Sequence, residues 1–276
     1  MHILTVDVEE WYHLLGVECL NDEDIQDRRM ESNLDRLLKV LEEHGARATF
    51  FVLGSVAEEY PDMVRKLAEH YEVGSHGYRH RLLGDMGLKE FEKDVMHSME
   101  VLERICGKRP IRYRAPGFSF PDEDYLRVLF DCGVETDCSL AAINHPYGKK
   151  MLKGDGPCLI EYGGRYIREM PPTTISLLGR RAGFLGGGYF RLFPYMLTRR
   201  WTEQNRDYSM TYIHPRDVDA GQPRIKGLPP LRRLRSYVGL KGAERKLRRY
   251  AGDFDFVDVA TAEGMIDWDR VPVVRL

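Results

Sequence analysis

The sequence predicts an α/β fold in which parallel strands form a sheet or a barrel, and three observations support this prediction. First, 276 residues with 43% hydrophobic content can bury one barrel-sized core. Second, short apolar runs alternate with amphipathic helical patterns over roughly the first half of the chain. Third, polar residues follow directly on several apolar runs, where a parallel fold collects its functional loops.

Five runs between residues 3 and 137 have the length and composition of buried strands. The expected strands are Ile3–Val6, Ala48–Leu53, Tyr71–Gly74, Ile111–Ala115 and Val134–Asp137. Helical periodicity fills the intervals between them. The expected helices are one that Ser32 or Asn33 caps and Gly45 ends, and three more at Pro61–Glu69, Leu88–Ile105 and about 121–132.

The alternation weakens in the second half, where Gly, Pro and basic residues are frequent. We expect an irregular insertion or lid at about 144–190, with short strands at Cys158–Ile160 and Tyr166–Met170. Regular elements return with a helix at Pro194–Asn205, strands at Ser209–Ile213 and Phe254–Val259, and a short helix at about 261–266. We interpret residues 1–276 as one catalytic domain.

Charge limits the classes of partner. The formal net charge is −2 and the pI is about 6.5, which argues against a nucleic-acid binder. One segment, about 224–249, is nevertheless strongly basic, with Glu244 as its single acid. It is either a solvated loop and helix or a patch that meets an anionic membrane or a phosphate-bearing substrate.

The cysteines and the N-terminal residues suggest a cytoplasmic protein. The five cysteines are odd in number and never spaced as CxxC, which fits reduced thiols: Cys19, Cys106, Cys132, Cys138 and Cys158. Met1 leads directly into a strand-like run, without the pattern of a secretory signal. We therefore expect a cytoplasmic location, with a peripheral position at the inner membrane face if the basic segment touches lipid.

Two histidines four residues apart, His76 and His80, suggest half of a metal site. On one helical turn they would share a face, although an HxxxH pattern also occurs by chance. Asp7 and Glu9, at the end of the first strand, would point the same way and supply carboxylates. Two histidines and one carboxylate leave positions open for water and substrate, which is typical of a catalytic metal site.

These groups suggest hydrolysis of an amide or ester. A divalent ion polarises a carbonyl and acidifies water, while the second carboxylate accepts a proton. Arg114 is a candidate for keeping that base ionised and oriented. His214, at the end of a late strand, is a candidate for the acid that protonates the leaving amine.

Four ordered motifs resemble those of the polysaccharide deacetylases, the NodB-homology group or carbohydrate esterase family 4. They are Thr5-Val6-Asp7-Val8-Glu9, Ser75-His76-Gly77-Tyr78-Arg79-His80, Arg114-Ala115-Pro116-Gly117 and Ile213-His214-Pro215. The stretches Asp-Val-Glu-Glu-Trp, Arg-Ala-Pro-Gly-Phe-Ser and Gly-Gly-Gly-Tyr-Phe-Arg further resemble a subgroup found with exopolysaccharide and surface-glycan gene clusters. The resemblance spans residues 1 to about 265.

The resemblance implies a distorted (β/α) barrel with fewer than eight repeats. It also implies metal-dependent removal of an N-acetyl group from an N-acetylhexosamine in a glycan or glycan precursor. Asp7 corresponds to the base, Arg114 to the arginine that tethers it, and His214 to the acid. His76 and His80 correspond to the metal histidines. We expect zinc, with cobalt, nickel and manganese as alternatives.

The first motif departs from the pattern of much of the family, which has two adjacent aspartates. Val8 stands where the second aspartate would be, and we assign Glu9 as the third metal ligand. Without Glu9 as a ligand, binding of the metal ion would be weakened or lost. The alternatives are therefore a metal-independent hydrolase of a small cyclic amide or ureide, and a glycan-binding barrel without catalytic activity.

Several residues next to these motifs are candidates for binding the sugar. Aromatic rings stack on sugars, but they also fill cores, so each has two interpretations. The candidates are Trp11, Tyr12, Pro116, Phe118, Tyr189 and Phe190. For His13 and His145 the alternatives are the mouth of the site and the surface, and we expect the surface. For Gly186-Gly187-Gly188 the alternatives are a phosphate-binding loop and a tight turn beside the substrate groove, and we expect the turn.

Overall fold

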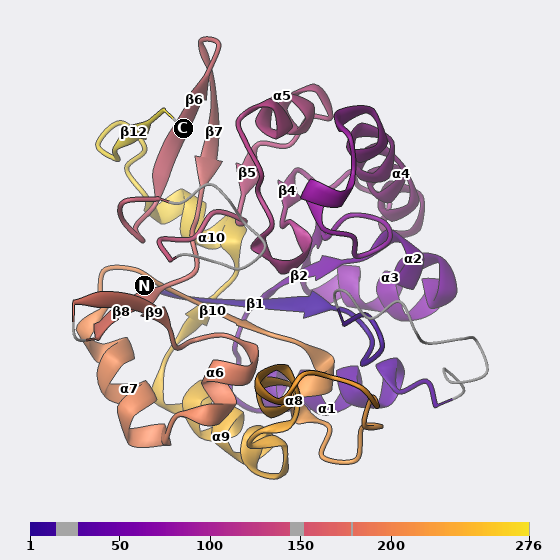
Figure 1. Ribbon diagram of the computed structural model, residues 1–276, viewed down its shortest axis with the longest axis vertical. Coiled ribbons are helices and arrows are strands. Elements are labelled where there is room, and N and C mark those ends of the chain that lie inside the picture. The colour runs from indigo at the N-terminus through magenta and orange to yellow at the C-terminus, as the bar shows by residue number, and fades with distance from the viewer. Residues whose placement is uncertain (15–26, 144–151, 178, 276) are drawn as a thin grey trace.

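The structure is a computed structural model that describes residues 1–14, 27–143, 152–177 and 179–275 (Figure 1). Ten strands form one sheet. Its order is β10 (Ser209–Ile213), β1 (His2–Val8), β2 (Thr49–Val52), β3 (Glu72–Ser75), β4 (Arg112–Tyr113), β5 (Thr136–Asp137), β7 (Arg165–Glu169), β6 (Cys158–Tyr162) and β12 (Val273–Val274), with β11 (Phe256–Val257) paired to β1. All pairs are parallel except β6 with β7. No pairing within the described residues closes the sheet into a complete barrel.

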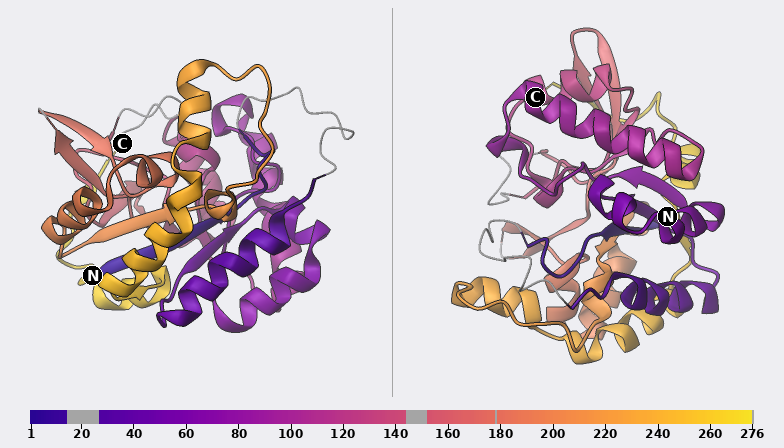
Figure 2. Two further views of the ribbon diagram at one scale, coloured as in Figure 1. Left: turned by 90° about the horizontal axis from the view of Figure 1, so that it is seen from below. Right: turned by 90° about the vertical axis from the view of Figure 1, so that its right-hand side faces the viewer.

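Helices surround this sheet. They are α1 (Met30–Glu43), α2 (Gly54–Glu59), α3 (Pro61–His70), α4 (Leu88–Cys106), α5 (Asp124–Asp131), α6 (Gly187–Leu192), α7 (Tyr195–Gln204), α8 (Pro230–Tyr237), α9 (Leu240–Asp253) and α10 (Val259–Met265). Short 3₁₀ turns lie at η2 (Leu83–Asp85), η3 (Pro116–Phe118) and η4 (Pro215–Val218), and β8 (Thr174–Leu177) forms a hairpin with β9 (Arg180–Gly183). Figure 1 shows β1 across the middle of the molecule, with α4 and α5 above it and α6 to α9 below. Figure 2 shows α8 and α9 following one another along one flank.

Alternation along β1 separates a structural face from a functional face. Leu4, Val6 and Val8 pack into the hydrophobic core beneath the helices. Ile3 belongs to a second, smaller core cluster, and the next residues on its face are Thr5 and Asp7. Because successive side chains of a strand point to opposite faces, the apolar face fixes the direction of Asp7.

The register of the parallel strands brings distant residues to one edge of the sheet. Val6 pairs with Ile213, so Asp7, near the end of β1, lies level with His214, which follows β10. Ser75 pairs with Tyr113, so His76 and Arg114 also leave their strands together. The carboxyl ends of β10, β1, β3 and β4 thus meet, as expected for the functional edge of a parallel α/β sheet.

The predicted α/β fold with parallel strands is confirmed, and most expected elements lie within a few residues of the observed ones. The unpredicted elements include α2, both strands of the β8–β9 hairpin, α6 and β12, and the basic segment contributes to two helices, α8 and α9, where a loop and one helix were expected. The segment at about 144–190 is also more regular than expected, because β6 and β7 extend the main sheet beyond β5. The strands β6 and β7 coincide with the two short strands predicted there.

The predicted cap of the first long helix is wrong. The helix begins at Met30, so Ser32 and Asn33 lie inside it. The Glu10 carboxylate instead accepts hydrogen bonds from the backbone N–H groups of Arg29 (2.9 Å) and Met30 (2.8 Å). A carboxylate far away in sequence thus satisfies donors that a local cap would otherwise satisfy. Within the described ranges, no helix combines the length and apolar composition needed to cross a membrane.

Candidate active site

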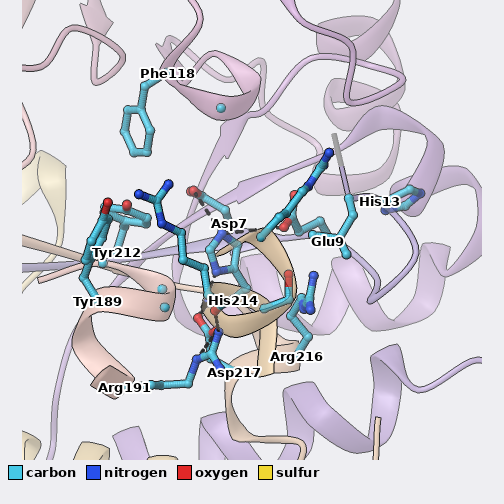
Figure 3. Close-up of a pocket in the computed structure, with 18 of the residues that line it drawn as sticks. Asp7, Glu9, His13, Phe118, Tyr189, Arg191, Tyr212, His214, Arg216 and Asp217 are labelled. Atoms are coloured by element: carbon cyan, nitrogen blue, oxygen red, sulfur yellow. Dashed lines mark hydrogen bonds and ion pairs between the residues drawn. The ribbon is translucent and has the colours of Figure 1, made fainter. Parts of the chain in front are cut away.

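Glu9, His76 and His80 form a cluster at the carboxyl edge of the sheet. Each offers a ligand atom, and these three atoms lie within 4.8 Å of one another. Glu9 follows β1, and the two histidines follow β3. The predicted set of two histidines and one carboxylate therefore occurs in the structure as a compact group in which Glu9 and His76 are buried and His80 is partly buried (Figure 3 shows Glu9 among the residues of the pocket).

The chemistry of these donors fits a divalent metal ion. His76 Nδ1 donates to the Arg114 carbonyl oxygen (2.8 Å), which leaves Nε2 as the free ligand atom. Burial lowers the pKa of His76 to about 4, so the ring is neutral as a ligand must be. Burial would raise the pKa of Glu9, but His80 and His214 hold it well below its usual range. Glu9 Oε2 is buried and has no aligned hydrogen-bond partner, although it lies 2.5 Å from His80 Nε2.

The histidines do not lie on a helical turn, contrary to the first expectation. They sit in the loop between β3 and η2, where Gly77 (φ 77°) and His80 (φ 48°) have left-handed backbone conformations. This loop still brings the two imidazole centres within 5.2 Å. In the described chain, the non-glycine residues with positive φ are His80 and Phe118, and both line the same pocket.

Asp7 is held by a buried arginine. Arg114 Nη1 donates to Asp7 Oδ1 (2.8 Å) and to Thr5 Oγ1 (2.7 Å), and the guanidinium lies 4.4 Å from the centre of the Phe51 ring. Burial would lower the pKa of Arg114, but Asp7 raises it above its ordinary value. One carboxylate oxygen is thus fixed, whereas Oδ2 faces His214 Nε2 at 4.0 Å.

His214 is oriented by Asp217, three residues later in η4. His214 Nδ1 donates to Asp217 Oδ2 (2.9 Å), and Arg191 Nε lies 2.9 Å from Asp217 Oδ1. His214 Nε2 consequently faces Glu9 Oε1 (3.6 Å) and Asp7 Oδ2 (4.0 Å). Burial would lower the pKa of His214, but Asp217 and Glu9 raise it to about 9, so the ring carries a proton that it can donate.

These groups line one pocket of about 470 Å³, a size that suits a small ligand or a sugar unit. Figure 3 shows Asp7, Glu9 and His214 at its centre, with Tyr189 and Tyr212 on one side and His13 on the other. Phe118 packs edge-on against Tyr212, with ring centres 4.8 Å apart. Phe118 and Tyr189 were expected here, and the structure adds Tyr212 to this aromatic wall.

Other members of the expected sugar wall lie elsewhere. Trp11 is buried and donates from Nε1 to the Asp27 carbonyl oxygen (2.7 Å), and Phe190 is a core residue that packs against Tyr250. Their hydrophobic rings are used for folding, so the expectation of sugar contact is corrected for both. Of the remaining candidates, Tyr12 and Pro116 are not among the described residues that line this pocket.

His13 also differs from expectation, because it lines the pocket rather than the outer surface. Its ring centre lies 6.2 Å from that of His80, and its Nδ1 accepts a hydrogen bond from the Glu10 backbone N–H (3.0 Å). Burial lowers the pKa of His13 to about 4, and His80 adds to this effect. His145 and Cys19 lie outside the described residues.

The three consecutive glycines allow close approach at the pocket wall. A Cβ atom at Gly186 would lie 1.8 Å from the Tyr212 ring, and one at Gly187 would lie 3.2 Å from His214 Cε1. At Gly188 it would lie 2.5 Å from the Arg235 carbonyl oxygen of α8. The glycines therefore let α6 begin directly against the site.

The charged pocket residues that the sequence analysis did not single out include Asp217, Arg191 and Arg216. Asp217 had a usable signal, because an acid three residues after His214 can close a capping box, as it does here. Arg191 and Arg216 reach the site through tertiary packing, and no local pattern distinguishes them from other arginines.

The site lies at the edge of a parallel α/β sheet, and it places a cluster of histidines and a carboxylate beside an aspartate and a further histidine. This arrangement is typical of a hydrolase. Comparison with family models gives a match to polysaccharide deacetylase over residues 23–136 and to a domain of unknown function, DUF3473, over residues 138–263. The peptidoglycan deacetylase of Helicobacter pylori is 32% identical over 230 residues, covering 71% of this chain and 74% of that protein. The chain belongs to the polysaccharide deacetylase family.

Two further comparisons agree. The peptidoglycan-N-acetylmuramic acid deacetylase PdaC of Bacillus subtilis is 38% identical over 101 residues, which cover 36% of this chain and 22% of PdaC. Matches to three curated deacetylases, PdaC among them, span only about a fifth to two fifths of their lengths. A crystal structure of a candidate polysaccharide deacetylase from Mycobacterium smegmatis has a TM-score of 0.70 at 19% identity, covering 100% of this chain and 92% of that one, which shows a shared fold.

Proposed function

We propose that this protein is a metal-dependent hydrolase that removes the N-acetyl group from an N-acetylhexosamine in a glycan or glycan precursor. One observation carries the proposal: Asp7, tethered by Arg114, and His214, tethered by Asp217, face the Glu9, His76 and His80 cluster in one pocket. Membership of the polysaccharide deacetylase family and the printed activities of its relatives support it.

The proposed roles follow from the hydrogen bonds. Asp7 accepts a proton from the water molecule that attacks the acetamide carbonyl, and Arg114 keeps this carboxylate ionised and oriented. His214 gives its Nε2 proton to the sugar nitrogen as the C–N bond breaks, so that acetate and a free amine are the products. A divalent ion held by Glu9, His76 and His80 would act as a Lewis acid towards the carbonyl and the water molecule. We propose zinc, because imidazole and carboxylate ligands suit it, with cobalt, nickel and manganese as competitors.

The experiment that tests this function is an acetate assay on N-acetylglucosamine oligomers and on nucleotide-linked N-acetyl sugars, with and without added zinc or cobalt. We expect acetate release that chelation abolishes and metal restores. Asp7→Asn should reduce turnover at least a hundredfold, in line with the loss of a general base, while sugar binding is retained. Full turnover by Asp7→Asn would remove Asp7 from its role, and acetate release without any metal would favour the metal-independent alternative.

We also propose a reducing compartment, the cytoplasm, and a role in surface-polysaccharide assembly. Support for the compartment comes from the described cysteines, Cys106, Cys132, Cys138 and Cys158, which all carry free thiols. The sugar-active pocket and the subgroup resemblance support the role in assembly. Cell fractionation with an antibody to the protein tests the location, and recovery in a secreted fraction would contradict it.

A contact with anionic lipid is the last part of the proposal. Lys241, Arg245 and Arg249 are exposed and lie four residues apart on α9, so they form one basic stripe along that helix. Such a stripe is attracted to anionic lipid by about 1 kcal/mol per basic residue. Sedimentation with phosphatidylglycerol vesicles, compared with phosphatidylcholine vesicles, should show binding to the former alone. Equal binding by a Lys241→Ala/Arg245→Ala variant would contradict the contact.

A further inference from the structure

Each acid that lines the pocket already has a basic partner. Asp7 pairs with Arg114 at 2.8 Å, and Asp217 pairs with Arg191 at 2.9 Å. Glu9 Oε2 lies 2.5 Å from His80 Nε2 and belongs to the proposed metal cluster. Each acidic side chain that lines the pocket therefore already has a basic group beside it.

Among the described residues, three arginines that line the same pocket have no carboxylate partner. No carboxylate of the described ranges lies within 4.0 Å of a guanidinium nitrogen of Arg216, Arg232 or Arg235. Arg216 is only 4% exposed; its Nε donates to Gln222 Oε1 (3.1 Å), whereas its Nη2 is buried without a hydrogen-bond partner. Figure 3 shows the Arg216 side chain beside Glu9, away from Tyr189 and Tyr212.

Helix α8 brings the other two arginines to the pocket. Arg232 and Arg235 line it, and the Arg235 guanidinium lies 5.4 Å from the centre of the Tyr189 ring. Arg191 fixes the end of this helix by donating to the carbonyl oxygens of Arg235 (3.0 Å) and Val238 (2.7 Å). Arg233, on the same helix, lines a separate groove and provides a matched comparison.

A buried guanidinium with an unused donor is costly unless a ligand supplies the missing acceptor. The planar fork of donors on arginine matches phosphate and carboxylate groups, which accept two parallel hydrogen bonds. We propose that the pocket takes an N-acetylated sugar that also carries a phosphate or carboxylate group. Arg232 and Arg235 of α8 bind this anionic group, and the charge of Arg216, on the Glu9 side of the pocket, adds to the attraction for it. The proposal rests on the function proposed above and narrows its substrate class.

Binding calorimetry on the purified, metal-loaded protein tests this inference without requiring turnover. The probes are N-acetylglucosamine 1-phosphate, N-acetylmuramic acid as the carboxylate, and neutral N-acetylglucosamine. We expect at least one anionic sugar to bind roughly tenfold or more tightly than the neutral one, since hydrogen bonds to charged groups are the stronger class. The two anionic arms distinguish phosphate from carboxylate.

The variants decide whether the arginines cause the preference, because a bound metal ion would also attract an anion. Arg232→Ala/Arg235→Ala should lose most of the preference, whereas Arg233→Ala should keep it. Arg216→Lys should weaken anion binding as well, with thermal unfolding showing whether the variant is folded. Equal binding of neutral and anionic sugars, or the same preference in the double variant and in Arg233→Ala, would overturn the inference. Acetate release without an anionic preference overturns this inference alone, and anionic binding without acetate release overturns only the deacetylase function.

Discussion

Arg114 Nη1 donates a 2.8 Å hydrogen bond to Asp7 Oδ1 across 107 residues of sequence, and the two side chains are 0% and 4% exposed. Removing one member of a buried ion pair leaves an uncompensated charge. We therefore expect Arg114→Leu to destabilise the protein by about 3–5 kcal/mol and to abolish acetate release. Chemical denaturation measures the first effect.

A double variant separates the structural effect from the catalytic one. Asp7→Asn/Arg114→Leu removes both charges, so it should recover part of the stability lost in Arg114→Leu while remaining inactive. If the free energy of unfolding of Arg114→Leu nearly equals that of the native protein, breaking the buried Asp7–Arg114 ion pair does not destabilise the fold.

The metal cluster gives a second prediction. His76→Ala and Glu9→Gln should each lower bound metal, because each removes one of three donor atoms that lie within 4.8 Å of one another. Glu9→Asp should also bind weakly, since the shorter side chain cannot reach the histidines. Elemental analysis after dialysis measures this, with His70→Ala, an exposed histidine on α3, as the control. His70→Ala should keep its metal. If His76→Ala binds as much metal as His70→Ala, His76 is not a metal ligand.

The sequence could indicate the groups that we propose as catalytic because each lies at the end of a recognisable strand. Ile3–Val6 and Ser209–Ile213 are apolar runs that end at Asp7 and His214, and the parallel register places those ends together. The distinction between wall and core could not be predicted in the same way. Phe190 and Tyr189 are neighbours in sequence, yet Phe190 packs in the core and Tyr189 lines the pocket, because consecutive residues of the short helix α6 point in directions about 100° apart.

The sequence also could not show how the charges are partnered. Arg29 pairs with Asp219 and Arg191 pairs with Asp217 because η4 packs against α1 and α6. In the part of the chain that the structure describes, the same tertiary packing leaves Arg216 without an ion pair within 4.0 Å. The local sequence around these arginines does not distinguish the ones that stabilise the fold from the ones that face the pocket.

A buried carboxyl pair beneath the site predicts a pH dependence of stability. Burial raises the pKa of Glu169 well above its usual value of 4.5, and it raises the pKa of Asp137 to about 6. The folded protein therefore keeps a proton on Glu169 that the unfolded chain releases above about pH 4.5. This contribution to stability is complete below that pH and is lost as pH rises towards the pKa in the folded state.

Glu169→Gln should remove this slope, which is about 1.4 kcal/mol per pH unit for one proton. Glutamine retains the oxygen that accepts from the Leu140 N–H (3.1 Å) and adds a donor for Asp137. As pH rises above about 4.5, urea unfolding should show the native protein losing stability relative to the variant. Glu135→Gln, at an exposed position, should follow the native curve. Parallel curves for all three proteins would show that Glu169 ionises normally.

Gly186 provides the last prediction, because its hydrogen atom touches the aromatic wall. A Cβ atom there would lie 1.8 Å from the Tyr212 ring, so Gly186→Ala must displace either Tyr212 or the start of α6. Forcing a methyl group into a packed site typically costs about 1–3 kcal/mol, and displacement of Tyr212 should also raise KM for the sugar. The matched control is Gly242→Ala in α9, where a Cβ atom would meet nothing within 4 Å. Alanine should stabilise that helix by about 0.5–1 kcal/mol, since glycine is a poor helix former. Opposite signs for the two substitutions in thermal unfolding would show that Gly186 is required by contact with Tyr212. An equal, small effect would mean that the wall yields freely and does not define the sugar site.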